Sequence, residues 1–242
     1  MPDDVVLLPS LGRPASDFTD LVHRLENNSY TAHPIEPPRS VAAGANLHDV
    51  AAGVVTQLSE RGVRSFHLVG HAFGNRLARM IAADFPDHIA SLTLLAAGGY
   101  VPIPATVLES LVACFDTSLP IDEHVHHVGR AFFAPGHDPS SWASGWMPEV
   151  ASWQTAALEA TEMEDWWDAT APHVLVIQGL ADAVAPPENG RRYVHDHADV
   201  ARLVEIPDAG HALILEQADR VGQAVVSFLL EVDGAGARVG PS

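Results

Sequence analysis

Short apolar runs alternate along the chain with longer stretches in which apolar residues recur at helical spacing. The short runs predict strands, and the longer stretches predict amphipathic helices. The predicted strands cover residues 5–8, 31–35, 66–69, 92–96, 174–178 and 203–206. The predicted helices carry their apolar stripes on residues 17–25, 47–58, 75–85 and 221–229. This alternation favours an α/β fold, with a mostly parallel, doubly wound sheet covered by helices on both faces.

The alternation stops between residues 102 and 172, where the sequence becomes aromatic and helix-like without strands. All five tryptophans of the chain lie in this stretch. An insertion of this kind predicts a helical cap over the end of the sheet where ligands bind in open α/β folds. We therefore expect a single domain over residues 1–242 with a cap at about 102–172, and a mobile tail from Asp233. Trp146 and Trp153 are candidate substrate contacts within the cap.

Composition and charge narrow the class of protein. Of the 242 residues, 47% are hydrophobic and 18% are charged, which is the balance of a folded globular chain. The formal net charge of −18 repels phosphate backbones and anionic membrane surfaces, so neither nucleic acid nor a membrane is an expected partner. The N-terminal residues lack the pattern of a secretory signal, and no apolar stretch reaches transmembrane length. These features predict a soluble, cytoplasmic protein, and nothing in them specifies an oligomeric state.

The segment that most clearly suggests a catalytic site is 70–74, Gly-His-Ala-Phe-Gly. It lies directly between a predicted strand and a predicted helix. Glycines two residues before and after a central residue are the spacing of a nucleophile elbow. The central residue of such a turn is strained, and the glycines let strand and helix approach closely. The turn exposes the side chain of residue 72, and His71 beside it is a candidate substrate contact.

Four segments together resemble the α/β-hydrolase family over nearly the whole chain. Residues 7–12 (Leu-Leu-Pro-Ser-Leu-Gly) are similar to the loop after the family's first central strand, and 70–74 to its elbow. Residues 178–182 (Gln-Gly-Leu-Ala-Asp) and 207–211 (Pro-Asp-Ala-Gly-His) resemble its acid and histidine loops. The chain order of nucleophile, acid and histidine is also the family's order.

The resemblance implies roles for five positions. Ala72 stands at the nucleophile position, His211 would be the general base, and Asp182 would orient His211. The backbone N–H groups of Leu11 and Phe73 would form the oxyanion hole. The family further implies hydrolysis of an ester, a lactone or a related carbonyl bond in an apolar small molecule.

Ala72 departs from the family, which has serine, or less often Asp or Cys, at this position. A methyl group cannot attack a carbonyl carbon, so the chain as written should be impaired for nucleophilic catalysis. Two interpretations remain open: alanine replaces the serine of an otherwise complete site, or alanine belongs to a branch that uses the other groups differently. In the second case His211 and Asp182 could catalyse a cofactor-free lyase, isomerase or cyclisation step, or the chain could be a non-catalytic ligand-binding protein.

No cofactor or metal is expected. The glycine-rich stretches lack both the phosphate-loop spacing and the dinucleotide fingerprint. His124, His126 and His127 lie close together in sequence, but no cysteine or carboxylate frame accompanies them, so a solvated helix is the preferred interpretation.

Overall fold

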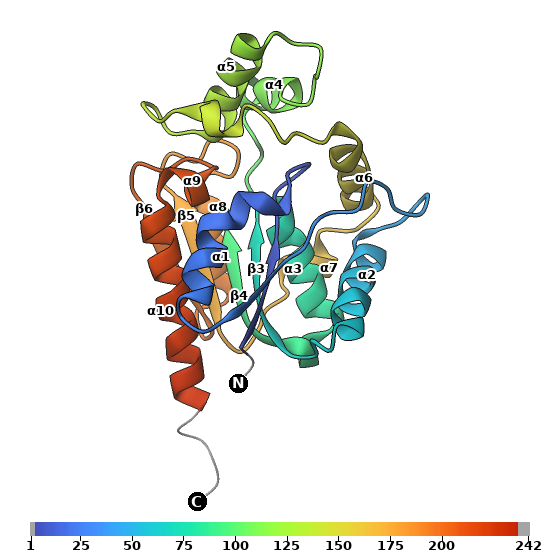
Figure 1. Cartoon of the computed structure of the whole chain (residues 1–242), viewed down its shortest axis with the longest axis vertical. Coiled ribbons are helices and arrows are strands. Elements are labelled where there is room, and N and C mark those ends of the chain that lie inside the picture. Colours follow the sequence, from blue (N-terminus) through green and yellow to red (C-terminus); the bar gives the residue numbers. More distant parts are fainter. Residues whose placement is uncertain (1–2, 237–242) are drawn as a thin grey trace, which may run out of the picture.

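The computed structural model describes residues 3–236 and shows a central sheet with helices on both sides (Figure 1). The six strands lie in the order β2-β1-β3-β4-β5-β6, and each neighbouring pair is parallel. Their bounds are β1 Asp4–Leu8, β2 Thr31–Pro34, β3 Phe66–His71, β4 Ile89–Leu95, β5 Val174–Gly179 and β6 Ala201–Ile206. The predicted α/β class and doubly wound sheet are confirmed.

Helices connect the strands, and four of them lie between β4 and β5. The α-helices are α1 Thr19–Glu26, α2 Leu47–Glu60, α3 Phe73–Asp84, α4 Ala105–Ala113, α5 Ile121–Phe132, α6 Pro148–Glu159, α7 Glu164–Trp167, α8 Glu188–Asp196, α9 Leu213–Glu216 and α10 Ala218–Gly236. Short 3₁₀ turns cover Ala15–Phe18, Pro86–His88 and Pro139–Trp142. Among the residues that the structure describes, no helix combines the length and apolar character needed to cross a membrane.

Side-chain alternation along the strands divides the core into two layers. Val6 and Leu8 of β1 face one side of the sheet, where they pack in a cluster with α2, α3, α7 and α8. Val5 and Leu7 face the other side and pack with α1, α9 and α10. Because successive strand residues point to opposite faces, both faces need apolar residues, which explains the uninterrupted apolar runs of the sequence.

Three local expectations need correction. Helix α3 begins at Phe73 and not at residue 75, because one residue, Ala72, makes the whole turn after β3. Helix α8 was not predicted, since its sequence buries Tyr193 together with small or polar side chains and shows no apolar stripe. The tail was expected to be mobile from Asp233, but α10 continues to Gly236 and the Tyr30 hydroxyl donates to the Asp233 carboxylate at 2.6 Å. Residues 237–242 lie outside the described part.

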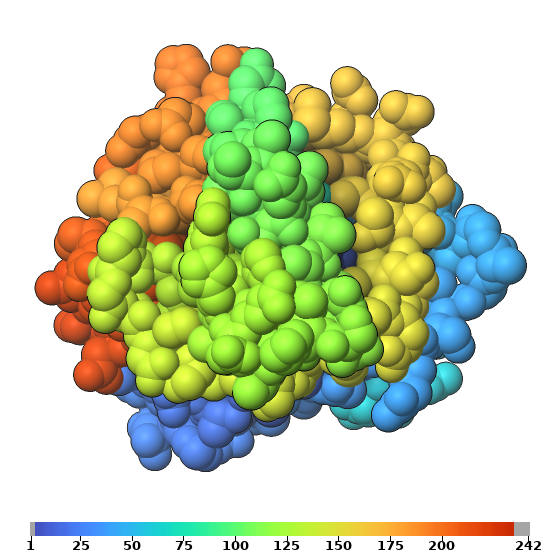
Figure 2. Space-filling view, turned by 90° about the horizontal axis from the view of Figure 1, so that it is seen from above, coloured from blue at the N-terminus to red at the C-terminus, as the bar shows by residue number. Residues whose placement is uncertain are grey.

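The segment between β4 and β5 contains α4 to α7. Helices α4 and α5 lie above the sheet in Figure 1, and α6 lies above α2. Seen from above, this segment covers the end of the molecule, with a narrow gap between its green and gold parts (Figure 2). Helix α7 differs from the others, because Trp166 and Trp167 pack in the core cluster against α3. We therefore use the name cap helices for α4, α5 and α6 only.

Candidate active site

The turn between β3 and α3 places Ala72 in a strained backbone conformation. Its φ of 53° and ψ of −108° are unusual for a residue with a side chain. Such a conformation costs about 1–3 kcal/mol and persists only where the surroundings impose it. Here the Ala72 N–H donates to the Leu95 carbonyl at 3.0 Å, and the Ala72 carbonyl accepts from the Asn75 N–H at 3.1 Å. The elbow geometry is therefore present although the side chain is only a methyl group.

Gly70 and Gly74 permit this turn by having no side chain. A Cβ at Gly70 would lie 2.3 Å from the Gly74 carbonyl oxygen, and a Cβ at Gly74 would lie 2.0 Å from the Leu8 carbonyl oxygen. Both distances are far below van der Waals contact with backbone atoms that cannot move aside. The close approach of strand and helix that the sequence pattern predicted is confirmed at both glycines.

Gly74→Ala should lower the free energy of unfolding by about 3 kcal/mol or more, because the new methyl group overlaps the β1 backbone. Gly53→Ala is the matched control: Gly53 lies in α2, where an added Cβ meets no atom within 4 Å. This control should raise the free energy of unfolding by about 0.5–1 kcal/mol through helix propensity. Urea denaturation of both variants checks the pair. Equal effects in the two variants would contradict the steric explanation.

His211 and Asp182 form a buried hydrogen-bonded pair. His211 Nδ1 lies 2.9 Å and 3.0 Å from the two carboxylate oxygens of Asp182, and each residue is 3% exposed. The carboxylate can only accept, so Nδ1 carries the proton and Nε2 is left as the base. The backbone N–H groups of Val184 and Ala185 hold the Asp182 carboxylate at 3.0 Å and 2.7 Å. The fold thus brings together two loops that are 29 residues apart in sequence.

Two side chains, those of His71 and Glu216, hold the backbone around His211, a role that the sequence did not indicate. His71 Nε2 donates to the His211 carbonyl oxygen at 2.8 Å. Burial, and then the neighbouring His211, lower the pKa of His71 to about 3, so His71 is a neutral donor. The Glu216 carboxylate accepts from the Gly210 N–H at 2.7 Å and from the Ala134 N–H at 2.6 Å. Burial raises the pKa of Glu216 above its usual value.

The N–H groups of Leu11 and Phe73 are available to a ligand. Phe73 is the first residue of α3, where a backbone N–H has no partner within the helix. Within residues 3–236 neither this N–H nor that of Leu11 donates a hydrogen bond. The loop that carries Leu11 is held by cap helix α6, because the Gly12 N–H donates to the Gln154 side-chain oxygen at 2.7 Å. Gln154 is a functional candidate that the sequence did not indicate.

Gln154→Ala should loosen this loop, because the buried Gly12 N–H would lose its acceptor. An unpaired buried backbone donor costs about 1–3 kcal/mol. We expect a decrease of that size in the free energy of unfolding, measured by urea denaturation. In a variant with a nucleophile at position 72, kcat should also fall about tenfold or more. Gln223→Ala, at an exposed position of α10, is the control and should change neither quantity measurably. A Gln154→Ala protein with normal stability and kcat would show that the loop is held by other contacts.

A cavity of about 290 Å³ lies between the sheet end and the cap helices. Ala72, His211, Leu11 and Phe73 all line it, so four of the predicted site residues face one space. Asp182 lies behind His211 and does not line the cavity. The other walls are largely apolar, and part of them comes from the cap helices, for example Leu111 of α4 and Leu158 of α6. A cavity of this size and lining suits a small apolar molecule.

The three predicted substrate contacts, Trp146, Trp153 and His71, do not line this cavity. Trp146 stacks on Arg13 at 4.7 Å and donates to the Trp142 carbonyl, within the aromatic cluster of the cap. Trp153 is half-buried: its ring packs edge-on against the Phe73 ring, with centroids 6.3 Å apart, and its indole N–H donates to the Pro38 carbonyl at 3.0 Å. His71 lies beneath His211. Aromatic residues in the cap pack with one another, and this packing cannot be distinguished from ligand contact by sequence alone.

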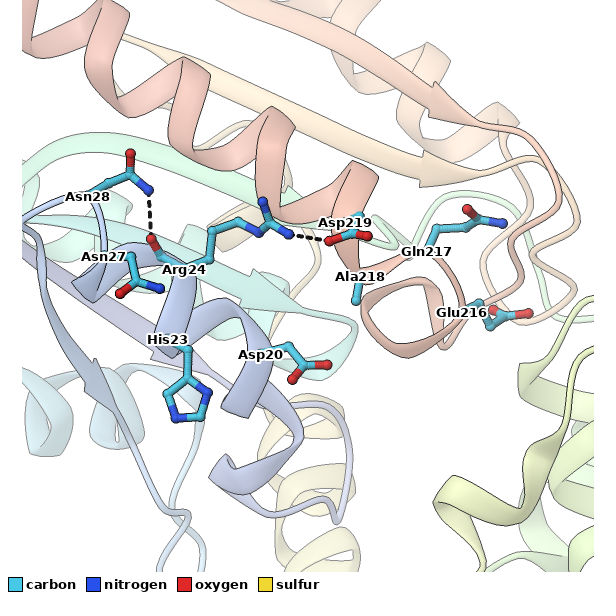
Figure 3. A pocket seen from close by; sticks show the side chains of 9 residues that line it. All are labelled: Asp20, His23, Arg24, Asn27, Asn28, Glu216, Gln217, Ala218 and Asp219. Carbon is cyan, nitrogen blue, oxygen red and sulfur yellow. Dashed lines mark hydrogen bonds and ion pairs between the residues drawn. The ribbon is translucent and has the colours of Figure 1, made fainter.

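A second hollow is polar and lies elsewhere, between α1 and the start of α10 (Figure 3). Arg24 and Asp219 form an ion pair across it, and the Arg24 carbonyl accepts from the Asn28 side chain at 2.8 Å. This hollow contains no nucleophile or base of the predicted site. Within residues 3–236, no three His, Cys, Asp or Glu side chains are grouped so that they could hold a metal ion.

Comparisons with known proteins agree with this architecture. The sequence profile of the alpha/beta hydrolase family matches residues 5–224. The chain is 26% identical to a pimeloyl-[acyl-carrier protein] methyl ester esterase of Neisseria meningitidis, covering 90% of this chain and 91% of that protein. It is 28% identical to a 2-hydroxymuconate semialdehyde hydrolase of a Pseudomonas species, covering 77% and 69%.

Among solved structures, an esterase from Exiguobacterium antarcticum aligns with a TM-score of 0.76 and 18% identity, over 93% of this chain and 91% of that one. That likeness shows a shared fold. The family profile spans nearly the whole sheet and the elbow, and the structure places the matched segments around one cavity. The chain therefore belongs to the alpha/beta hydrolase family.

Proposed function

We propose that the cavity binds an apolar small molecule that contains an ester, a lactone or a related carbonyl bond. The observation that carries this proposal is that Ala72, in the strained turn, lines the same cavity as His211, which is paired with Asp182. The carbonyl oxygen would lie between the Leu11 and Phe73 N–H groups. These donors would hold the negative charge that develops on this oxygen as the carbonyl carbon is attacked.

With serine at position 72, the covalent route is complete. His211 Nε2 would take the serine proton, the serine oxygen would attack the carbonyl carbon, and Asp182 would stabilise the imidazolium that forms. His211 would then return the proton to the leaving alcohol. With Ala72 this route is closed, and His211 can act only on water or on a proton of the bound molecule.

Intact-mass analysis after reaction with aryl esters tests the proposal. Ala72→Ser is expected to gain the mass of one acyl group, and the chain as it stands is expected to gain none. Ala72→Ser together with His211→Ala is the control, and should not acylate at a comparable rate. A serine variant that binds no ester and forms no adduct would contradict the proposed hydrolase site.

A second candidate function is cofactor-free acid/base catalysis, such as a lyase, isomerase or cyclisation step. It is favoured by the complete pairing of His211 with Asp182 beside an alanine, since general base catalysis needs no nucleophile. His211 would remove a proton next to the carbonyl, and the Leu11 and Phe73 N–H groups would hold the enolate oxygen.

Proton exchange distinguishes this second function. The Ala72 protein in heavy water should exchange the carbon-bound protons next to a ketone or ester carbonyl, and His211→Ala should abolish the exchange. A protein that binds such ligands but shows neither exchange nor turnover would be a ligand-binding member of the family.

A further inference from the structure

The cavity contains one cationic side chain that the proposed chemistry does not use. Arg76 lines the cavity, one helical turn after Ala72 on α3. Ala72 lines the same cavity from the turn before α3, so the Arg76 guanidinium and the position of the reacting carbonyl share one space. Side chains on a helix also tilt toward its N-terminus, which directs Arg76 toward the turn that carries Ala72.

Arg76 has no anionic partner in the part of the chain that the structure describes. Among residues 3–236 its guanidinium makes no hydrogen bond or ion pair, although the chain carries a net charge of −18. Its guanidinium carbon lies 5.7 Å from the centroid of the Trp166 ring. Burial lowers the pKa of Arg76 to about 10, so the group is still a cation at neutral pH. An unpaired cation in such surroundings is costly unless a ligand supplies the opposite charge.

The neighbouring Arg79 shows what a structural arginine looks like in this fold. It is fully buried, donates to the Asn75 side chain at 2.8 Å and to the Gly98 carbonyl at 2.9 Å, and stacks on Trp166 at 4.6 Å. Arg79 does not line the cavity. Arg76 makes none of these hydrogen bonds, so holding the fold together does not account for it.

We propose that Arg76 binds a carboxylate of the substrate, so that the cavity selects a carbonyl compound carrying a free acid group a few atoms from the reacting carbonyl. This inference rests on the proposed function, since it uses the carbonyl position beside Ala72. A planar guanidinium matches a carboxylate with two parallel hydrogen bonds. The remaining walls are largely apolar, including Ile103 and Leu108, and fit the short hydrocarbon chain that joins the two groups.

Binding to the chain as it stands tests this inference without turnover. Calorimetric titration compares monomethyl adipate, which has one ester and one carboxylate, with dimethyl adipate, in which both ends are esters. The Ala72 protein should bind the half ester about tenfold or more tightly than the diester. Arg76→Met should remove the preference by weakening half-ester binding only, and Arg76→Lys should restore part of it.

Arg64→Met is the matched control, because it removes the same charge from an exposed position that does not line the cavity. It should keep the preference of the parent. Thermal unfolding of Arg76→Met should match the parent or exceed it, since an unpaired charge is replaced by an apolar side chain. A parent that binds both esters equally, or an Arg76→Met protein that still prefers the half ester, would overturn the assignment. An Ala72→Ser variant without an adduct would instead count against the hydrolase chemistry.

Discussion

Ala72→Ser is expected to convert this chain into an active esterase, with an increase in kcat on the order of 10³ to 10⁶. The elbow, the backbone donors and the pair of His211 with Asp182 are already in place, so the one substitution supplies what is missing. Serine adds a single oxygen at a residue that is 9% exposed and lines the cavity. The turn is already strained, so the fold should accept the change at little cost.

Turnover of aryl esters under saturating substrate measures this increase. Ala42→Ser is the control, because it adds a hydroxyl at an exposed loop residue and should leave the rate at the parent level. If Ala72→Ser and Ala42→Ser proved equally slow while both bound the ester, the carbonyl would not be positioned at the elbow.

Asp182→Asn in the Ala72→Ser background is expected to lower kcat by on the order of 10⁴, with a much smaller change in KM. The Asp182 carboxylate accepts the His211 Nδ1 proton and so keeps Nε2 free to act as base. An asparagine amide can instead donate to Nδ1, which places the proton on Nε2 and removes the base. Asp182 does not line the cavity, so substrate binding should be nearly unchanged.

Steady-state kinetics checks this split between kcat and KM. Asp199→Asn, at an exposed position before β6, is the control for the loss of one negative charge. A decrease in kcat/KM caused only by a higher KM would show that Asp182 shapes the cavity and does not orient His211.

The local patterns in the sequence are sufficient to predict the strands of the sheet and the position of the elbow. A run of apolar residues indicates a strand, and glycines at a fixed spacing indicate a turn such as 70–74. Both signals are local, because these structures depend on residues that are close in sequence. Helix α8 shows the limit of this reasoning. It buries Asn189 and Gly190 beside Tyr193, so its packing is not visible as an apolar stripe.

Resemblance to the family identified Asp182 and His211 as site residues, and the structure joins them by a hydrogen bond. The resemblance did not identify which residues of the cap contact a ligand. Trp146 and Trp153 are candidates because aromatic side chains often contact ligands, yet Trp146 packs on Arg13, and Trp153 packs edge-on against Phe73 without lining the cavity. The local sequence does not distinguish packing from ligand contact, because an aromatic ring in a cap can pack against another ring or against a ligand.

Residue types, strand order along the chain and the alanine at position 72 are properties of the sequence by itself. Only the tertiary structure shows that Gln154 holds the Gly12 loop from 142 residues away, and that Arg76 faces the cavity with no carboxylate partner among residues 3–236. The physical reason is that these roles come from contacts between segments distant in sequence. An arginine or a glutamine on a helix has the same local signature whether it meets solvent, backbone or a cavity.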